Sequence, residues 1–451
     1  MPKKLVCLIL LLLLLPLTPV YAPSLEGIRT FRYNTASGWE IFHSLGAIQL
    51  GGYIYNVGYM EYSQAGYLVK TDQYGQFVYV KKIQIGTGQT YAEGITTDGT
   101  YLYVLAISQG SLTYFHPYVL KFAQDGSLVS AVEISGFSNL DFMGSEILYD
   151  GTNLLLACTT NTTTLVLIKL STSLSFVSSV RVDGFDNRKD IYKKVAVTKS
   201  STNYFILSNK YGYFLKISTD FATVGASGYL NYDHMFLYAV YDGTYVWAVS
   251  VRISSTNDIV VTCFSSTMSI NSMNKINTGY TNIQDARGIR AVEGSSSYLY
   301  IGATNSGTQI LMAKVDISLS TPATVWGRYL GDGVSYTFHS PITYYNGIAY
   351  ILSPYTTIVS GVGYNSLGVL RVSSSGSCDQ CSVTSLSVSR TALSDSITST
   401  TYTITSLTPT TASVTPTITD ITSSGIVTSI CPPPPTISFS DYTFTYNYNG
   451  Y

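Results

Sequence analysis

Residues 98–106 read DGTYLYVLA, a tight turn followed by an aromatic and aliphatic strand. This stretch decides the fold because the same combination recurs. Seven copies occur, and they read GGYIYNVG, DGTYLYVLA, DGTNLLLAC, SSTNYFILS, DGTYVWAVS, GSSSYLYIG and YNGIAYILS. Successive copies are about 48 residues apart, a period typical of repeats that are each one supersecondary unit.

A second landmark is the residue that closes a strand just before another turn. It is basic in six of the seven units, as in YLVKTDQYG at 67–75. The six residues are Lys70, Lys121, Lys169, Lys216, Lys314 and Arg371. In the remaining unit, IVVTCFSST places Phe264 at this point. Both landmarks therefore indicate seven units.

Each unit contains four short runs with alternating apolar positions, separated by Gly, Asn, Asp and Ser turns. Four strands in a repeat of this length are typical of a β-propeller blade. An array of β-sandwiches is the alternative, but the lack of linkers between the units favours closure into a ring. We therefore predict an all-β fold, with a seven-bladed β-propeller over residues 23–376.

A ring needs a joint between its two ends. The last unit, 337–376, supplies only three strands, and the strand GIRTFRYN at 27–34 precedes the first unit. We expect residues 27–34 to complete the last blade. Over residues 27–376 the pattern resembles the broad superfamily of secreted prokaryotic seven-bladed propellers. That resemblance rests on repeat geometry, so it implies the fold and carries no family function.

The first 22 residues, MPKKLVCLILLLLLLPLTPVYA, have the form of a secretory signal peptide. Lys3 and Lys4 precede an apolar run from Leu5 to Leu15, and small residues follow at cleavage spacing. The alternative is an uncleaved anchor, for which the apolar run is short. We expect a secreted, extracellular or cell-surface protein with no membrane span after signal removal.

The composition is neutral and rich in hydroxyl groups. Charged residues make up 11% of the chain, the formal net charge is −1, and there are 39 tyrosines. Typical soluble domains carry about 25% charged residues. Bulk electrostatics therefore gives no reason to expect nucleic acid as a partner. Such a surface suits contacts with copies of the chain, other cell-surface proteins or glycans, and no cofactor is expected.

After Gly376 the composition changes to Ser and Thr with spaced apolar residues, as in TTYTITSL and GIVTSI. Between 377 and 431 the charged residues are Asp379, Arg390, Asp395 and Asp420. β-Branched residues in alternation favour strands. We predict a small β-sandwich-like module at 377–431, the alternative being a glycosylated Ser/Thr stalk.

The cysteines fall into two groups. Cys158 and Cys263 lie within strands of different, non-adjacent units, so we expect buried thiols. Cys378, Cys381 and Cys431 flank the C-terminal module. A bond from Cys431 to either of the other two would close a loop of roughly 50 residues and stabilise the module by about 4 kcal/mol. The sequon at Asn161 is a candidate glycosylation site.

The candidate ligand-binding site lies at one mouth of the channel. His43, His234 and His339 precede the turn glycine of their units by eight or nine residues, and Asp141 and Asp285 lie near the same offset. These positions begin the innermost strands, and Arg287 lies close by. Imidazoles and carboxylates together suggest a divalent metal site or a general base acting on a saccharide. The alternative is a hydrated polar mouth, so the metal remains unknown and no catalytic residue is assigned.

The chain continues with CPPPP and the aromatic run TISFSDYTFTYNYNGY. Ile437 and Phe439 share one face, and after a one-residue shift at Ser440–Asp441 one face is shared by Tyr442, Phe444, Tyr446 and Tyr448. This phase change predicts a bulge in one long strand. Residues 432–451 are therefore a proline spacer and a terminal strand. This strand either completes its own module or adds to the sheet of a neighbouring molecule. We expect the second.

Two classes of function follow. The first is a structural or adhesive surface protein, a subunit of an extracellular assembly or filament joined by strand donation. The second is a secreted carbohydrate-active hydrolase or lyase, or a ligand-binding propeller, with its site at the channel mouth. The sequence contains no Gly-x-Ser-x-Gly, phosphate-loop or His-Glu-x-x-His motif. This favours the first class.

Overall fold

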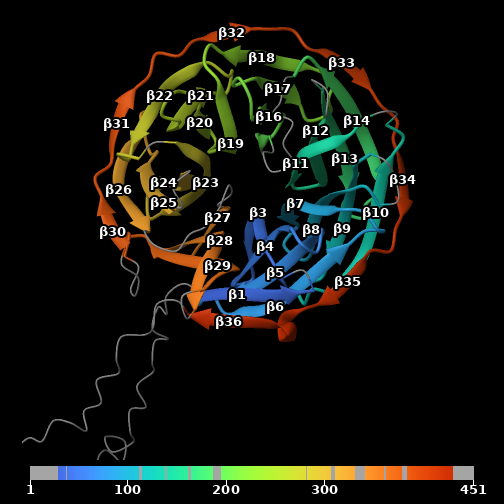
Figure 1. Ribbon diagram of the computed structural model, residues 1–451. Coiled ribbons are helices and arrows are strands. Elements are labelled where there is room, and N and C mark those ends of the chain that lie inside the picture. The colour runs from blue at the N-terminus through green and yellow to red at the C-terminus, as the bar shows by residue number, and fades with distance from the viewer. Residues whose placement is uncertain are drawn as a thin grey trace, which may run out of the picture.

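The computed structural model describes residues 29–36, 38–110, 114–137, 140–160, 164–185, 195–280, 282–305, 310–330, 341–359, 362–377 and 383–429. They form a seven-bladed β-propeller, as the repeats predict (Figure 1). The one helical segment in these ranges is a 3-10 turn, η1 (Thr422–Ser424). No helix in the described part of the chain has the length and apolar character needed to cross a bilayer.

Every blade is an antiparallel sheet whose first strand lies at the channel and whose fourth lies near the rim. Blade 1 consists of β3 (Phe42–Leu50), β4 (Tyr53–Met60), β5 (Ala65–Asp72) and β6 (Phe77–Gln84), and blade 2 of β7 (Thr90–Thr97), β8 (Leu102–Ser108), β9 (His116–Phe122) and β10 (Leu128–Ser135). Blade 3 consists of β11 (Phe142–Tyr149), β12 (Asn153–Thr160), β13 (Thr164–Ser171) and β14 (Phe176–Asp183), and blade 4 of β15 (Ala196–Lys199), β16 (Asn203–Leu207), β17 (Phe214–Ser218) and β18 (Val224–Leu230).

Blades 5 and 6 repeat this arrangement, and blade 7 takes its fourth strand from the N-terminal part of the chain. Blade 5 consists of β19 (His234–Tyr241), β20 (Tyr245–Arg252), β21 (Asp258–Ser265) and β22 (Ile270–Asn277). Blade 6 consists of β23 (Ile283–Glu293), β24 (Ser296–Asn305), β25 (Ile310–Asp316) and β26 (Ala323–Leu330). Blade 7 consists of β27 (Ile342–Tyr345), β28 (Ile348–Val359), β29 (Val362–Ser373) and β1 (Arg29–Thr35), with β2 (Gly38–Trp39) beside β1. The strand β1 pairs with β29, so the segment expected to close the ring lies in the last blade.

The C-terminal region is β structure, but its strands do not form a sandwich with one another. They are β30 (Val383–Leu386), β31 (Ser389–Ala392), β32 (Ile397–Ser399), β33 (Thr403–Ser406), β34 (Thr410–Ser413), β35 (Thr417–Asp420) and β36 (Gly425–Ser429). Each adds to the outer edge of one blade, in the order 6, 5, 4, 3, 2, 1 and 7. We call residues 383–429 the belt, which encircles the propeller at its rim (Figure 1).

The reason for this arrangement is that each blade offers an open strand edge. Unpaired backbone groups on such an edge are satisfied by an added strand. The belt pairs only with the second half of each outer strand in blades 1 to 6, as where Thr417–Asp420 meets Lys81–Gln84. The first half of each of these strands carries a β-bulge instead, at Val78, Val129, Val177, Gly225, Asn271 and Val325. Because bulges disrupt pairing, belt and bulges together protect the edges.

The belt has a seven-residue repeat, one per blade. It is clearest in TITSLTP at 403–409, TTASVTP at 410–416 and TITDITS at 417–423. The fifth position of each repeat, Leu407, Val414 and Ile421, packs into a hydrophobic cluster between two blades. The belt thus adds apolar side chains to the hydrophobic core, which lies between neighbouring blades.

In five of the six units that have it, the basic landmark forms a contact with the next blade, which we call the inter-blade staple. In blade 1 the Lys70 ammonium donates to the backbone oxygen of Gln124 in blade 2, at 3.0 Å, and lies 3.8 Å from the ring centroid of Tyr53. Burial lowers the pKa of Lys70. The same contact with the next blade joins Lys121 to Thr172, Lys169 to Thr219, Lys314 to Ser374 and Arg371 to Tyr74.

Candidate functional site

The innermost strands β3, β7, β11, β15, β19, β23 and β27 surround a central cavity of about 320 Å³. Its lining is mainly aliphatic, and the charged residues on it are Glu146 and Arg287. The guanidinium of Arg287 contacts the Asp285 carboxylate at 3.1 Å and donates to the backbone oxygen of Leu45 at 2.7 Å. Asp285 and Arg287 are 1% and 4% exposed, so this pair mainly bridges blades 6 and 1.

His43 lies near the start of β3, as its offset predicts, but its ring contacts groups of its own blade. The ring Nε2 is 2.9 Å from a carboxylate oxygen of Glu61, and the ring stacks on Tyr59 at 6.0 Å. Tyr59 continues into Tyr91 of blade 2 at 4.2 Å between centroids. His43 therefore belongs to an aromatic cluster that joins blades 1 and 2.

Asp141 precedes β11 and accepts a hydrogen bond from the backbone N–H of Phe115, at 2.8 Å. Phe115 packs on the Tyr91 ring at 5.7 Å between centroids. The carboxylate thus holds the loop before β9 beside the aromatic cluster.

His234 begins β19 and contacts the belt. Its Nε2 lies 2.8 Å from Asp395, and its Nδ1 lies 3.0 Å from the Ser250 hydroxyl. Because a carboxylate only accepts, Nε2 carries the proton and Nδ1 accepts from Ser250. Burial lowers the pKa of His234, although Asp395 opposes this. Arg252 contacts the other oxygen of Asp395 at 3.1 Å, and the Asp395 side chain is 2% exposed.

Serine, histidine and aspartate in contact suggest a hydrolase triad. Ser250 and His234 are both 0% exposed, however, so no substrate reaches the hydroxyl. A nucleophile must contact the reacting atom. We conclude that Ser250, His234 and Asp395 attach the belt to blade 5.

The structure therefore separates the residues that were expected to share the channel mouth. His43 and His234 bind different carboxylates in different blades, whereas Asp285 and Arg287 do lie together. Among the described residues no three His, Cys, Asp or Glu side chains gather as a metal site requires. His339, Asn161, Cys378, Cys381, Cys431 and the terminal strand residues from Ile437 to Tyr448 lie outside the described residues.

Two further cysteines are buried thiols within strands, as the sequence predicts. Cys158 and Cys263 are free and 0% exposed. Burial raises the pKa of both thiols to about 12, so neither is a reactive thiolate.

Sequence reasoning missed the roles of the tail charges. Asp395 binds His234 and Arg252, Asp420 binds Lys81 at 2.6 Å, and Arg390 donates to the Asn274 side chain at 3.1 Å. Although partial burial opposes ionisation, hydrogen bonds from Lys81 and Thr422 lower the pKa of Asp420 to about 2. One feature of the sequence could have revealed these roles: the three charged residues are isolated in a C-terminal segment that is otherwise almost neutral.

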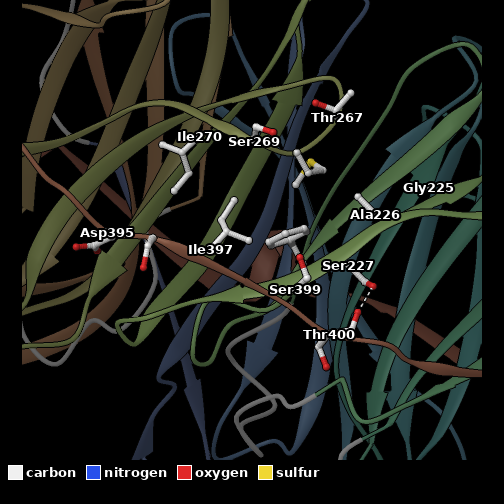
Figure 2. Close-up of a pocket in the computed structure, with 13 residues that line it drawn as sticks. Gly225, Ala226, Ser227, Thr267, Ser269, Ile270, Asp395, Ile397, Ser399 and Thr400 are labelled. Atoms are coloured by element: carbon white, nitrogen blue, oxygen red, sulfur yellow. Dashed lines mark hydrogen bonds between the residues drawn. The ribbon is translucent and has the colours of Figure 1, made fainter.

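A second cavity, of about 620 Å³, lies at the rim between blades 4 and 5 (Figure 2). Three elements build it: the bulged part of β18, the turn between β21 and β22, and the belt from Asp395 to Thr400. The belt wall is fixed to β18 by a bond from the Ser227 hydroxyl to the Thr400 backbone oxygen, at 2.5 Å. We call this cavity the rim groove.

Comparison with known proteins adds no functional assignment. No family model matches the chain, and no curated protein matches it. One similar solved structure is a protein of unknown function from Bacteroides caccae, with 11% identity, 69% of this chain and 87% of that chain covered, and a TM-score of 0.34. Another is dihydro-heme d1 dehydrogenase NirN in complex with DHE, with 12% identity, 80% and 78% covered, and a TM-score of 0.41.

Proposed function

We propose that the chain is a secreted structural or adhesive protein of the cell surface, and a subunit of an extracellular assembly. The observation that carries this proposal is the belt, in which a Ser/Thr-rich segment is added strand by strand to seven sheet edges. Strand addition is also a common way of joining separate chains. The exposed belt residues are mainly threonine and serine, which suits contact with neutral neighbours.

The proposed joint is between the terminal strand, residues 436–451, of one copy and β36 of another. β36 pairs with β1 on one side and exposes Ile426 and Val427, each at 46%. An apolar, exposed edge strand is a template for a further strand. The aromatic run offers a matching partner of high β propensity.

The experiment compares the full-length protein with a chain that lacks residues 436–451. We expect electron microscopy and light scattering to show polymers for the former and folded monomers for the latter, with equal thermal midpoints. Full-length protein that stays monomeric at all concentrations would contradict the proposal. Loss of folding on truncation would instead place the strand within its own chain.

A charged substitution tests the acceptor edge. Val427→Lys should abolish assembly because a lysine ammonium on an edge strand opposes pairing. The matched control is Val292→Lys, since Val292 is 57% exposed and lies at the end of β23. Equal assembly of both variants would exclude β36 as the acceptor.

A further inference from the structure

The rim groove lies where the sevenfold pattern is interrupted. Lys216 occupies the staple position of blade 4, but within the described residues no hydrogen bond joins its ammonium to blade 5. Its nearest aromatic ring is Phe205, at 6.0 Å. The turn of blade 5 that a staple would reach, at Thr267 and Met268, is instead a wall of the groove.

The residues of β18 that line the groove have small side chains. The bulge residue is Gly225, where blades 1, 2, 3 and 6 have valine. The residue after it is Ala226. This position is large in blades 1 and 6, which have Tyr79 and Trp326, and is a serine in blades 2, 3 and 5. The aliphatic stem of Lys216 lies over Gly225, and blade 5 also lacks a basic residue at the staple position, where it has Phe264. Such a departure from an internal rule marks a candidate functional site.

The chemistry of the lining restricts the ligand. Hydroxyl groups of Ser227, Thr267 and Ser399 surround an apolar surface that includes Ile270 and Ile397 (Figure 2). Among the described residues that line the groove none is basic, which disfavours phosphates and other anions. The one charged residue in this described lining is Asp395, whose two oxygens already bind His234 and Arg252.

We propose that the rim groove binds a neutral saccharide. A sugar ring presents hydroxyl groups at its edge and C–H groups on its face, which match hydroxyl-bearing walls around an apolar floor. The volume of about 620 Å³ lies within the range of small-molecule sites. Because the belt forms one wall, the site exists only when the belt is in place. This inference is independent of assembly.

The test uses the full-length chain and the probes glucose, galactose, mannose and N-acetylglucosamine, with glucuronate as the charged comparison. Ligand-observed NMR should detect at least one neutral sugar and weaker or no binding of glucuronate. Thr267→Arg, which places a long side chain in the groove from an exposed turn, should reduce affinity about tenfold or more. Ser173→Arg, at the equivalent turn position of blade 3, should retain wild-type affinity.

A second variant restores the blade pattern. Ala226→Trp copies the residue at this position in blade 6 and should fill the groove, whereas Ser130→Trp in blade 2 serves as its control. No binding of any neutral probe by the wild-type chain would overturn the proposal. Equal binding by Thr267→Arg and wild type would overturn it as well. Binding without polymer formation in the full-length protein would contradict only the proposed assembly.

Discussion

Lys70 shows how one side chain joins two blades. Its ammonium is buried between a backbone oxygen of the next blade and a tyrosine ring, so loss of hydration is offset by a hydrogen bond and a cation–π contact. The repetition of this contact explains the basic residue at the same place in five of the six units that have one.

Lys70→Met should lower the free energy of unfolding by about 1–3 kcal/mol, because it removes both contacts and leaves the Gln124 oxygen with only the Tyr55 hydroxyl as a donor, at 3.3 Å. Chemical denaturation followed by tryptophan fluorescence measures the change. Lys216→Met is the matched control, with an expected change within about 0.5 kcal/mol. Equal losses in both variants would show that the staple contributes nothing specific.

His234 makes the attachment of the belt dependent on pH. Burial lowers its pKa in the folded state below the usual 6.5, while Asp395 and Asp233 oppose the shift and Arg252 supports it. The contribution to stability is therefore complete above about pH 6.5 and is lost as the pH falls through the folded-state value. Each unit of pKa difference corresponds to about 1.4 kcal/mol.

Amide hydrogen exchange measures this effect locally. We expect protection of residues 395–399 to decrease between pH 6.5 and pH 4.5, after correction for intrinsic exchange rates, while residues 410–413 change less. His234→Gln should remove the extra sensitivity, although it also lowers stability. A uniform loss of protection along the belt would point to other groups.

The residue scale also shows why the candidate site could be predicted only in part. The offset from the turn glycine placed His43 and His234 correctly at the starts of inner strands. It could not predict where the rings point, because bulges at Leu45 and Leu237 change the phase of each strand just after the histidine. Nor could it bring Asp395 to His234 from 161 residues away.

At the scale of elements, the strands of the seven blades follow directly from turn chemistry and two-residue alternation. The arrangement of the belt strands could not be predicted in this way, because their two-residue alternation is interrupted every seven residues. Positions such as Tyr402, Leu407 and Pro409 face inward with spacings that suit a strand crossing from one blade to the next. Two-residue alternation predicted β structure correctly, but only the longer period indicates what that structure packs against.

Removal of one belt strand should have a local effect. A chain that ends at residue 424 loses β36, so the edge of β1 becomes open from Arg29 to Tyr33. We expect a lower thermal midpoint and loss of hydrogen-exchange protection in β1 and β29, with blade 4 unchanged. A chain that ends at residue 429 is the control and should match the full-length protein. An unchanged midpoint in the shorter chain would mean that β36 adds no stability.

At the scale of the whole molecule, ring closure and the belt are two separate ways of holding the blades. The first depends on β1 joining β29, and the second on seven added strands and the charges of Arg390, Asp395 and Asp420. The repeat count and the strand at 27–34 were sufficient to predict the first. The second depends on long-range pairing between the belt and all seven blades, which local patterns do not specify.

The position of β36 determines how the protein responds to mechanical load. Arg29 pairs with Ser429, so tension applied at these two residues separates this antiparallel pair one hydrogen bond at a time. β36 is held by β1 alone, whereas β1 is also held by β29, so β36 detaches first. Each later belt strand is likewise bound on one side, and we expect a series of small extensions of about 24 Å, the extended length of seven residues. Single-molecule pulling would record these steps before the ring opens; one large event at the outset would contradict them. In the proposed role at the cell surface, a chain held in this way would lengthen gradually under drag and rewind when the force is released.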